Sequence, residues 1–414
     1  MKIEVLNTGS ELLLGSVLNS HAAYFGQQLF PLGLRISRQT CIPDGPEIRQ
    51  ALLETFGRCD IVLATGGLGP TTDDITREVV AELLGRTLLF DESILNAIGE
   101  RLRKRSIPVQ ERMKRQAMVP EGATVLPNNN GTAPGLYVPA TSSGEKPTPH
   151  LFLLPGPPRE LKPMFQESVL PILTSLLPAD APKLECRTYR IVGLGESIVE
   201  ERIGFALSQI PELEVGYCAR PNEVDLRLIG SPALLDQHEA KVLAALGENL
   251  ASRSEEMLED VIVNALIRAS LTLAVAESCT GGLLANRITN VPGSSTVFIE
   301  GFVTYANEAK THTLDVSAEL LAQHGAVSAE TASAMAEHAL AKSGADFALS
   351  TTGIAGPGGG SEEKPVGTVF VGFAERGQPV QAHKYFFKMD RETFKYVTTQ
   401  TALDLLRRRL AQRG

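Results

Sequence analysis

The chain has 414 residues and a formal net charge of −9, with 43% hydrophobic and 21% charged residues and no tryptophan. At about 150 residues per domain, this length predicts two or three domains. The composition is that of a folded globular protein. An acidic chain has no overall attraction to nucleic acid, and no stretch reaches the ~18 apolar residues of a membrane span. We therefore expect neither a nucleic-acid partner nor a membrane protein.

The cysteines and the N-terminal segment indicate the compartment. The five cysteines are dispersed and form no CxxC pair, which argues against a disulfide framework and against a structural zinc site. The first fifteen residues, MKIEVLNTGSELLLG, carry polar side chains where a signal peptide has a continuous apolar core. We therefore expect a protein of the reducing cytoplasm.

The first part of the chain alternates strands with helices. Strands that alternate with helices at this spacing indicate parallel βαβ units. After an exposed loop at 139–149, residues 150–160 predict another buried strand that leads into a helix. We predict a doubly wound α/β domain over residues 1–175. Its first elements are strands at about 2–8, 35–42 and 60–65 and helices at 20–32, 46–57 and 72–84.

A linker at 178–183 and a small middle region follow. Residues 184–252 predict a β-α-β-β-α order, a small α+β domain of KH-like type. RNA binding is disfavoured, because the first turn, Gly193-Leu194-Gly195-Glu196, carries an acid where a nucleic-acid clamp needs a neutral or basic residue. We favour a spacer or a dimerisation module, and expect a homodimer because exposed strand edges invite pairing.

Residues 256–414 predict a third domain, again α/β. An amphipathic helix at 259–270 precedes a buried strand at 272–278, and a strand pair is expected around 297–305. The strand at 272–278 runs into the turn Glu277-Ser278-Cys279-Thr280-Gly281-Gly282, which opens a helix. A hydroxyl beside the amides of a helix N-terminus suits a nucleophile next to an anion site. Alternatively, Ser278 or Thr280 only caps the helix.

Two further clusters argue against the alternative that the turn at 277–282 only caps a helix. In Thr304-Tyr305-Ala306-Asn307-Glu308-Ala309-Lys310, Lys310 lies on the first turn of a helix, where the helix dipole lowers the pKa of an amine. A Ser–Lys pair is a known variant of the serine nucleophile. The glycine-rich stretch 351–361 follows a buried strand and suits a phosphate or an oxyanion, or it is a flexible hairpin loop.

A similar turn in the first domain suggests a phosphate site. Gly66, Gly67 and Gly69 follow the strand at 60–65, and Asp73 and Asp74 open the next helix. Glu11 follows the first strand, so the three carboxylates are expected at the sheet edge where ligands sit. Carboxylates hold a divalent ion that bridges phosphates. Helix capping by Asp73 or Asp74 is the alternative.

Motifs in both halves of the chain resemble one family. AESCTGG, GFVTYANEAK, HGAVS and STTGIAGPGGGSEEKPVGTV resemble the C-terminal domain of the CinA (competence/damage-inducible protein A) family of nicotinamide mononucleotide amidases. GSELLLG, TGGLGPTTDDIT, GTAPG and LPGPPREL resemble the molybdopterin-binding-like domain of the same family. The resemblance spans the whole chain.

The resemblance implies hydrolysis of nicotinamide mononucleotide to nicotinic acid mononucleotide and ammonia. We assign Ser278 as nucleophile, Lys310 as base and Tyr305 as a hydroxyl that orients one of them. Ser295, which precedes the strand, is a rival hydroxyl that would complete a Ser–Lys relay. Cys279 is a rival nucleophile without a suitable histidine, since His312 lies on another helix face. For binding the substrate we expect Thr280, Gly281, Gly282, Thr304, Thr352, Gly353 and Arg391, with Arg391 on the phosphate unless it is a plain surface charge.

For the first domain the resemblance implies hydrolysis of ADP-ribose with a divalent metal. Gly66, Gly67 and Gly69 would bind the substrate, and Glu11, Asp73 and Asp74 would bind the metal. No cofactor is expected in the amidase domain. A molybdopterin-handling protein and a non-catalytic competence or DNA-repair accessory factor are the alternatives. The first leaves the SCTGG and NEAK motifs unexplained, and the second needs a nucleic-acid surface that the net charge of −9 does not provide.

Overall fold

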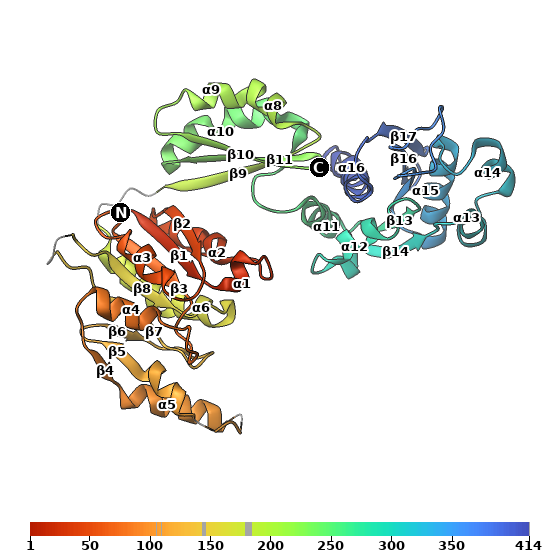
Figure 1. The fold of residues 1–414 in the computed structure, drawn as a ribbon. Coiled ribbons are helices and arrows are strands. Elements are labelled where there is room, and N and C mark those ends of the chain that lie inside the picture. The colour runs from red at the N-terminus through yellow and green to blue at the C-terminus, as the bar shows by residue number, and fades with distance from the viewer. Residues whose placement is uncertain (105, 109, 143–145, 179–183, 414) are drawn as a thin grey trace. The chain divides into compact units, whose positions relative to one another are not determined.

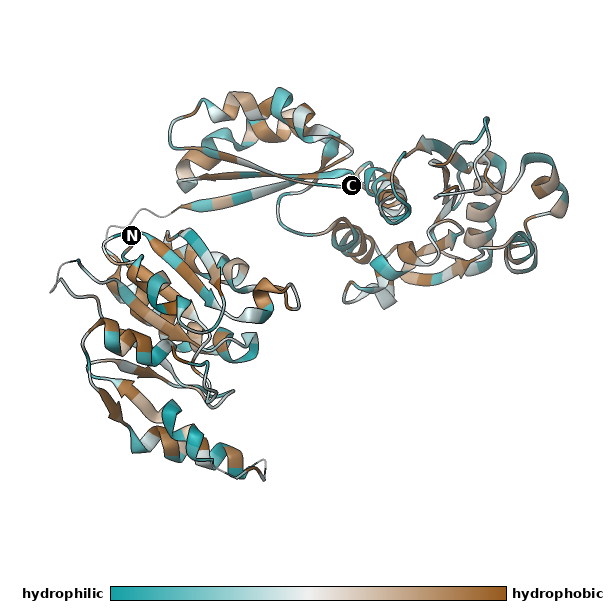
Figure 2. Cartoon of the chain, viewed as in Figure 1, coloured by the Kyte–Doolittle hydropathy of each residue, from teal (hydrophilic) through white to brown (hydrophobic). Residues whose placement is uncertain are grey.

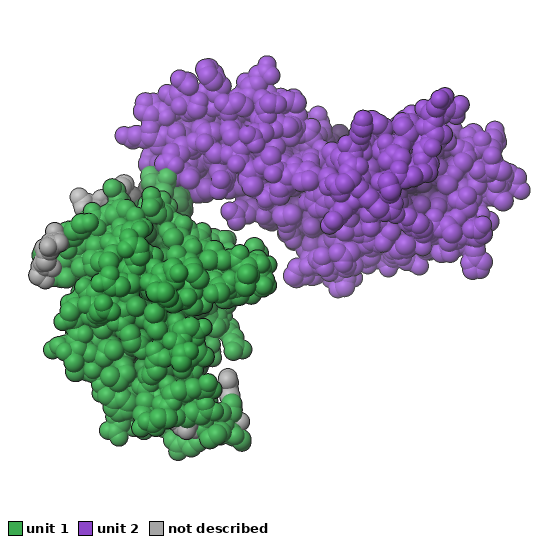
Figure 3. Space-filling view, in the orientation of Figure 1, with its two compact units in different colours: residues 1–184 green, residues 185–414 purple. Residues whose placement is uncertain are grey.

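The computed structural model describes all residues except 105, 109, 143–145, 179–183 and 414. It divides into two compact units, residues 1–184 and residues 185–414 (Figure 3). The predicted linker at 178–183 lies, from residue 179 onward, outside the described residues.

Unit 1 is built on a six-stranded sheet (Figure 1). Its strands are β1 (Ile3–Thr8), β2 (Ile36–Ile42), β3 (Ile61–Thr65), β6 (Thr124–Leu126), β7 (Gly135–Val138) and β8 (His150–Leu154). They lie in the order β2-β1-β3-β8-β7-β6, in which the first four are parallel, β7 is antiparallel to β8, and β6 is antiparallel to β7. The expected doubly wound α/β architecture is confirmed.

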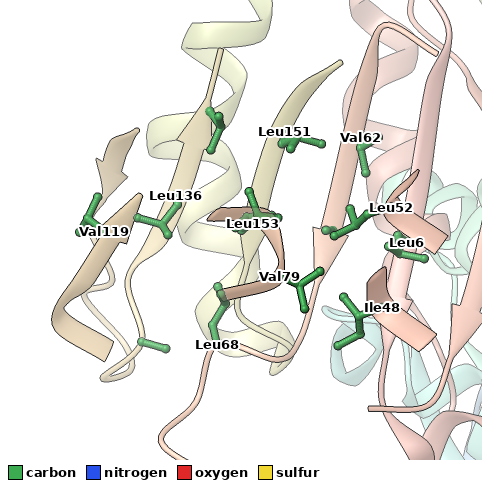
Figure 4. Close-up of a cluster of buried hydrophobic side chains, with 14 of the residues drawn as sticks. Leu6, Ile48, Leu52, Val62, Leu68, Val79, Val119, Leu136, Leu151 and Leu153 are labelled. Carbon is green, nitrogen blue, oxygen red and sulfur yellow. The ribbon is translucent and has the colours of Figure 1, made fainter. Parts of the chain in front are cut away.

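Helices cover both faces of this sheet, because its central strands are apolar on both sides. On β3, Val62 and Ala64 join one core cluster and Ile61 and Leu63 join the other, the pattern of a parallel sheet buried between two helix layers. Figure 2 shows these strands as the brown centre of the unit, and Figure 4 shows the first cluster. The helices are α1 (Ser10–Leu13), α2 (His21–Leu29), α3 (Glu47–Leu53), α4 (Thr76–Leu83), α6 (Pro158–Met164) and α7 (Leu170–Leu176).

Two details of unit 1 differ from the expectation. A small antiparallel pair, β4 (Leu88–Phe90) with β5 (Met118–Pro120), flanks α5 (Glu92–Arg103). Helix α4 begins at Thr76 rather than at residue 72. The reason is local: the Asp74 carboxylate accepts hydrogen bonds from the amide and the hydroxyl of Thr71, which closes a turn ahead of the helix.

The first part of unit 2 is the small α+β domain. Its strands are β9 (Glu185–Val192), β10 (Glu214–Arg220), β11 (Glu223–Gly230) and β12 (Leu250–Ser252), in the antiparallel order β10-β11-β9-β12. Its helices are α8 (Glu196–Val199), α9 (Phe205–Ser208) and α10 (Pro232–Leu246). The KH-like β-α-β-β-α order is confirmed.

The second part of unit 2 is built on a five-stranded sheet in the order β14-β13-β15-β16-β17. The strands are β13 (Leu273–Glu277), β14 (Phe298–Val303), β15 (Phe347–Gly353), β16 (Thr368–Glu375) and β17 (Gln381–Phe386). β14, β13 and β15 are parallel. The expectation of a strand pair around 297–305 is wrong, because the structure has the single strand β14 there. The carboxyl ends of β14, β13 and β15 meet at one edge, which brings together the three turns singled out in the sequence.

Six helices surround this sheet: α11 (Leu258–Ala269), α12 (Leu283–Thr289), α13 (Asn307–Leu314), α14 (Ala318–His324), α15 (Ala329–Ser343) and α16 (Arg391–Ala411). α16 also contacts the KH-like domain. Its Gln400 donates to Glu223 at 2.9 Å, and Arg407 donates to the carbonyls of Leu250 and Glu248. None of the helices in the described residues is long and apolar enough to cross a membrane.

Candidate active site at the edge of β13

A serine and a buried lysine meet at the carboxyl edge of the C-terminal sheet. Ser278 directly follows β13, and Lys310 is the fourth residue of α13. Lys310 Nζ lies 3.1 Å from Ser278 Oγ, 3.0 Å from the Thr304 carbonyl and 3.2 Å from the Tyr305 carbonyl. The structure thus brings the two residues of the expected Ser–Lys pair into hydrogen-bond contact.

Burial lowers the pKa of Lys310 below the ordinary lysine value. The residue is 1% exposed, and desolvation is the largest cause of the shift. The sequence suggested the helix dipole as the cause, but removal of the ammonium from water dominates, because an ammonium loses its hydration while the nearby carbonyls replace only part of it. The amine therefore spends more of its time neutral.

The turn after β13 is tied by a carboxylate that the sequence did not single out. Glu277 is fully buried, and its carboxylate accepts hydrogen bonds from the amides of Gly282, Leu284 and Ala285 at 2.8 to 3.0 Å. Glu277 thus satisfies the first amides of α12, in place of a capping hydroxyl from Ser278 or Thr280.

The amides of Gly281 and Gly282 are consequently not directed at a ligand. That of Gly281 donates to the Ser278 carbonyl at 3.1 Å, and that of Gly282 donates to Glu277. The expectation that both amides stabilise a substrate anion does not hold in this structure. In the described part of the chain, the amides of Cys279 and Thr280 have no protein acceptor.

Cys279 is placed poorly for nucleophilic attack. Its side chain is 5% exposed, and burial raises the pKa of the thiol to about 12. A thiol with such a pKa is almost wholly protonated at neutral pH, and only the thiolate attacks well. Ser278, next to an amine of lowered pKa, is the better candidate.

A pocket of about 280 Å³ opens over Ser278 and Lys310. Arg391, the first residue of α16, lines it and donates to the Gly356 carbonyl at 2.7 Å and to the Tyr305 hydroxyl at 2.8 Å. The Tyr305 hydroxyl was expected to orient Ser278 or Lys310. It instead contacts Arg391, while the Tyr305 carbonyl contacts Lys310.

Of the threonines near these turns, Thr352 lines the pocket, whereas Thr280, Thr304 and Thr351 are buried outside its lining. Thr280 and Thr351 share a hydrogen bond between hydroxyls at 2.7 Å, and the Thr352 hydroxyl donates to the Ala326 carbonyl at 2.6 Å. Thr352 and Gly353 line the pocket. The Thr304 hydroxyl is buried and has no hydrogen-bond partner in the described residues, while its carbonyl accepts from Lys310.

Ser295 lies at the opposite end of the sheet from Ser278. It is exposed and belongs to a short 3-10 helix at Ser294–Thr296, which precedes β14. Leu273, the first residue of β13, pairs with Phe298 at the start of β14, whereas Glu277 pairs with Val303 at its end. The expectation that Ser295 joins a Ser–Lys relay is therefore wrong for this structure.

A cation near the pocket was missed. Lys395 lies one helical turn after Arg391 on α16, and a Cβ atom built on Gly281 would lie 3.9 Å from Lys395 Nζ. No local pattern indicates this proximity, because α16 is far in the sequence from the turn that follows β13.

The glycine turn of unit 1 lies against its neighbours without room for side chains. Gly66 and Gly67 have φ of 96° and 67°, and a Cβ on either would collide with the Thr8 or Thr76 hydroxyl. Only glycine fits such a backbone at no cost. Arg77, also buried, donates to the Leu68 carbonyl at 3.0 Å and steadies the turn. Gly69 lies under the Asp74 carboxylate.

The carboxylates of unit 1 do not form the expected metal cluster. Among the described residues, no group of three or more His, Cys, Asp or Glu side chains could hold a metal ion. Asp73 is exposed, Asp74 is bound by Thr71, and Glu11 is folded back towards Gly9. The expectation that Glu11 joins Asp73 and Asp74 in one metal site is therefore wrong for this structure.

A buried polar network beside this turn was also missed. Asn7 on β1 donates to the Thr65 hydroxyl at 2.8 Å, and His21 Nδ1 lies 3.3 Å from both side chains. Burial lowers the pKa of His21. The Thr8 hydroxyl, next to Gly66, is buried and has no partner in the described residues. Polar residues at the ends of otherwise apolar strands are the signal that could have revealed this network.

Comparisons with known proteins divide the chain into three family domains, of which one lies in unit 1 and two lie in unit 2. Residues 255–410 match the model of the CinA C-terminal domain, residues 186–253 that of the damage-inducible protein CinA KH domain, and residues 4–175 that of a probable molybdopterin binding domain. A CinA-like protein of Akkermansia muciniphila is 47% identical over 97% of this chain and 96% of its own. The chain belongs to the CinA family.

Two further CinA relatives show the extent of the similarity. A protein of Caldicellulosiruptor bescii, named provisionally as competence-damage inducible, is 42% identical over 99% of each chain. The crystal structure of competence/damage inducible protein CihA from Agrobacterium tumefaciens has 45% sequence identity and a TM-score of 0.35, and it matches 36% of this chain and 91% of its own. The similarity to the C. bescii relative covers all three domains.

Proposed function

We propose that the C-terminal domain hydrolyses the carboxamide of nicotinamide mononucleotide to nicotinic acid mononucleotide and ammonia. The observation that carries the proposal is the buried amine of Lys310, 3.1 Å from the Ser278 hydroxyl, under a pocket open to a small molecule. An amide needs a nucleophile, a base that later protonates the leaving ammonia, and donors for the oxyanion.

The two backbone carbonyls around Lys310 explain how its lone pair is aimed. A neutral amine has two N–H groups and one lone pair in a tetrahedral arrangement. If the N–H groups donate to the carbonyls of Thr304 and Tyr305, the lone pair points to the remaining neighbour, Ser278 Oγ. The carbonyls also accept from the ammonium after proton transfer, so the charged intermediate is partly solvated by the protein.

The reaction then balances with these groups alone. Ser278 Oγ forms a bond to the carboxamide carbon, its proton moves to Lys310, and the carbonyl π electrons become an oxyanion. The amides of Cys279 and Thr280 are the unoccupied donors of the turn and would stabilise this charge. Lys310 gives the proton to the amide nitrogen as the C–N bond breaks, so that ammonia leaves as NH₃ and an acyl-Ser278 ester remains. A water molecule then loses a proton to Lys310 and attacks the acyl carbon. The ester bond breaks, and Ser278 Oγ takes the proton back from Lys310 as the acid is released.

The test is ammonia release from nicotinamide mononucleotide by the full chain. We expect stoichiometric ammonia and nicotinic acid mononucleotide from the wild type, and loss of both products in Ser278→Ala. Ser295→Ala is the matched control and should behave like the wild type, because this serine lies at the other end of β14. Absence of ammonia from the wild type, or full activity of Ser278→Ala, would contradict the proposal.

For unit 1 we propose binding and hydrolysis of a nucleotide pyrophosphate such as ADP-ribose at the turn after β3. This second function is favoured by the unpartnered Thr8 hydroxyl beside Gly66, where side chains are excluded and a phosphate can approach the backbone. A divalent ion would enter with the substrate, since Mg²⁺ is often held by one or two carboxylates together with phosphates. Asp73 and Asp74 are the carboxylates available. A molybdopterin phosphate is the alternative ligand for this turn.

Chelation separates the two proposals. We expect a chelator to stop ADP-ribose hydrolysis and to leave ammonia release unchanged, and Asp74→Asn to have the same selective effect. Glu82→Gln, in an exposed ion pair of α4, is the control. ADP-ribose that stays intact with every divalent metal tried would restrict unit 1 to binding.

A further inference from the structure

The junction between the KH-like domain and the C-terminal CinA domain holds a cavity of its own. Its volume is about 500 Å³, against about 280 Å³ for the pocket over Ser278. β12 of the KH-like domain, α11 and the last turns of α16 form its walls. Among the described residues, the linings of the two spaces have no member in common. The cavity at the junction is therefore a separate site.

Aliphatic and small side chains form most of the walls. Leu250 on β12, Leu271 after α11 and Leu410 on α16 line the cavity. Ala265 and Ala269 lie one helical turn apart on α11, and each brings only a methyl group to a place that a larger side chain would fill. Ligand cavities are mostly apolar, have volumes of roughly 300–1,000 Å³ and often lie between domains. The space thus suits the apolar body of a small molecule.

The charged residues of the lining all have the same sign. Arg268, Arg407 and Arg413 line the cavity, and none of its described lining residues is an aspartate or a glutamate. The whole chain, by contrast, has a net charge of −9. Cations gathered around a low-dielectric space attract an anion to it.

The three arginines differ in what they already bind. Arg407 donates to two backbone carbonyls near β12 and pairs with Asp404 at 2.6 Å. Arg413 pairs with Glu375. Arg268, exposed on the last turn of α11, has no ion pair or hydrogen bond within the part of the chain that the structure describes. The guanidinium of Arg268 is therefore the one that is free to take an anionic group.

We propose that this cavity binds a small amphipathic carboxylate, with its apolar body between β12, α11 and α16 and its carboxylate on Arg268. A carboxylate matches the planar pair of N–H donors of a guanidinium, and the apolar body removes the aliphatic walls from water. The bound molecule contacts both domains of unit 2 and so fastens one to the other. The proposal does not depend on the amidase reaction.

The test is a calorimetric titration of the full chain with octanoate. We expect saturable binding of one octanoate per chain with a negative heat-capacity change, which marks burial of apolar surface. 1-Octanol has the same apolar body without the charge and should bind about 10-fold to 100-fold more weakly, as for loss of a charge-assisted contact. Acetate has the charge without the body and should not bind measurably.

Two substitutions separate the contributions of the charge and of the cavity. Arg268→Met should weaken the binding of octanoate about 10-fold to 100-fold and leave that of 1-octanol unchanged, because only the carboxylate loses its partner. Ala265→Phe fills the cavity and should abolish the binding of both. Arg112→Met removes an exposed arginine of unit 1 and is the matched control.

Hydrogen exchange locates the bound molecule. Octanoate should slow the exchange of amides in β12, α11 and the last turns of α16, and leave unit 1 unchanged. Absence of saturable binding, protection at other elements only, or the same affinity for octanoate in Arg268→Met as in Arg112→Met would overturn the proposal. Self-association of the chain that Ala265→Phe abolishes would overturn it too, because it would assign the cavity to a second copy. Ammonia release does not enter the test, so failure of the proposed function leaves this inference standing.

Discussion

The turn after β3 and the turn after β13, each at the carboxyl ends of the parallel strands of its sheet, differ in where their polar groups lie. After β13, Glu277 turns inward and satisfies the amides of α12, and Lys310 is buried against Ser278. After β3, the carboxylates of Asp73 and Asp74 stay at the surface side of the turn, and the buried polar groups nearby are the hydroxyls of threonines, the Asn7 amide and the His21 imidazole. The first arrangement buries the proposed nucleophile and its proposed base, and the second leaves the proposed ligand site of unit 1 at the surface.

The largest expected effect separates two neighbours in the first turn. Ser278→Ala should lower kcat for ammonia release by about 10⁴-fold or more, as loss of a nucleophile does in other hydrolases. Cys279→Ala should retain activity within about 3-fold, since a thiol with a pKa raised to about 12 does not act as nucleophile. Steady-state ammonia release measures both. The reverse pattern would transfer the nucleophile to Cys279.

Lys310 should carry the pH dependence. Its pKa is lowered by burial, so the neutral amine and kcat/KM should both increase as pH rises through that lowered pKa, below the ordinary lysine value of 10.5. Lys310→Arg should lose about 10³-fold in kcat/KM, because a guanidinium stays charged at every working pH. A pH–rate profile from about pH 6 to 10 tests both statements.

The folded state should respond to the same amine with the sign that burial dictates. Between the lowered pKa and 10.5, the unfolded chain binds more protons than the native chain, so the free energy of unfolding rises with pH. Lys310→Met should remove this increase of the free energy of unfolding with pH, which urea unfolding at several pH values measures.

The activity prediction for Lys310 has its own contrary outcome. A near-normal turnover of Lys310→Arg would show that the residue supplies charge only.

Glu277→Gln should have an intermediate effect. A carboxamide offers one acceptor oxygen and brings an NH₂ group towards the amides of α12, so at least one amide loses its acceptor. We expect a loss of about 1–3 kcal/mol in the free energy of unfolding and a roughly 10-fold lower kcat, because Ser278 is the next residue. A Glu277→Gln variant with the kcat and the free energy of unfolding of the wild type would contradict this positioning role.

The smallest effect is expected in the second turn. His21 has a lowered pKa because it is buried, so below about pH 6.5 the unfolded chain takes up a proton that the folded chain does not. The free energy of unfolding should therefore decrease towards acid pH, by at most about 1.4 kcal/mol per pH unit. His21→Gln keeps an acceptor for Asn7 and should flatten this slope in urea titrations.

The sequence was sufficient for the fold class and for bringing Ser278 and Lys310 to one edge. Both follow from strand ends, and parallel strands share an edge. Ser295 shows the limit of considering residue type alone: it precedes its strand, and that fact already places it at the other edge. Strand polarity could have excluded it from the start.

The remaining differences come from long-range contacts. Glu277 lies in an apolar strand, and only its contact with α12 shows what its carboxylate does. Lys395 comes near Gly281 through packing of elements far apart in the sequence. The prediction of a metal site assumed that the carboxylates of neighbouring turns point to one place. The Asp74 carboxylate instead accepts hydrogen bonds from Thr71 within its own turn.

The contacts of α16 with the KH-like domain bear on how the chain unfolds. Gln400 reaches Glu223, a buried carboxylate that Arg190 and Arg220 also face, and Arg407 holds two carbonyls near β12. Breaking either half would strand these buried groups without partners, which costs more than keeping both halves folded. We therefore expect the three family domains to unfold as two cooperative blocks, residues 1–184 and residues 185–414, with the KH-like domain in the same block as the C-terminal CinA domain.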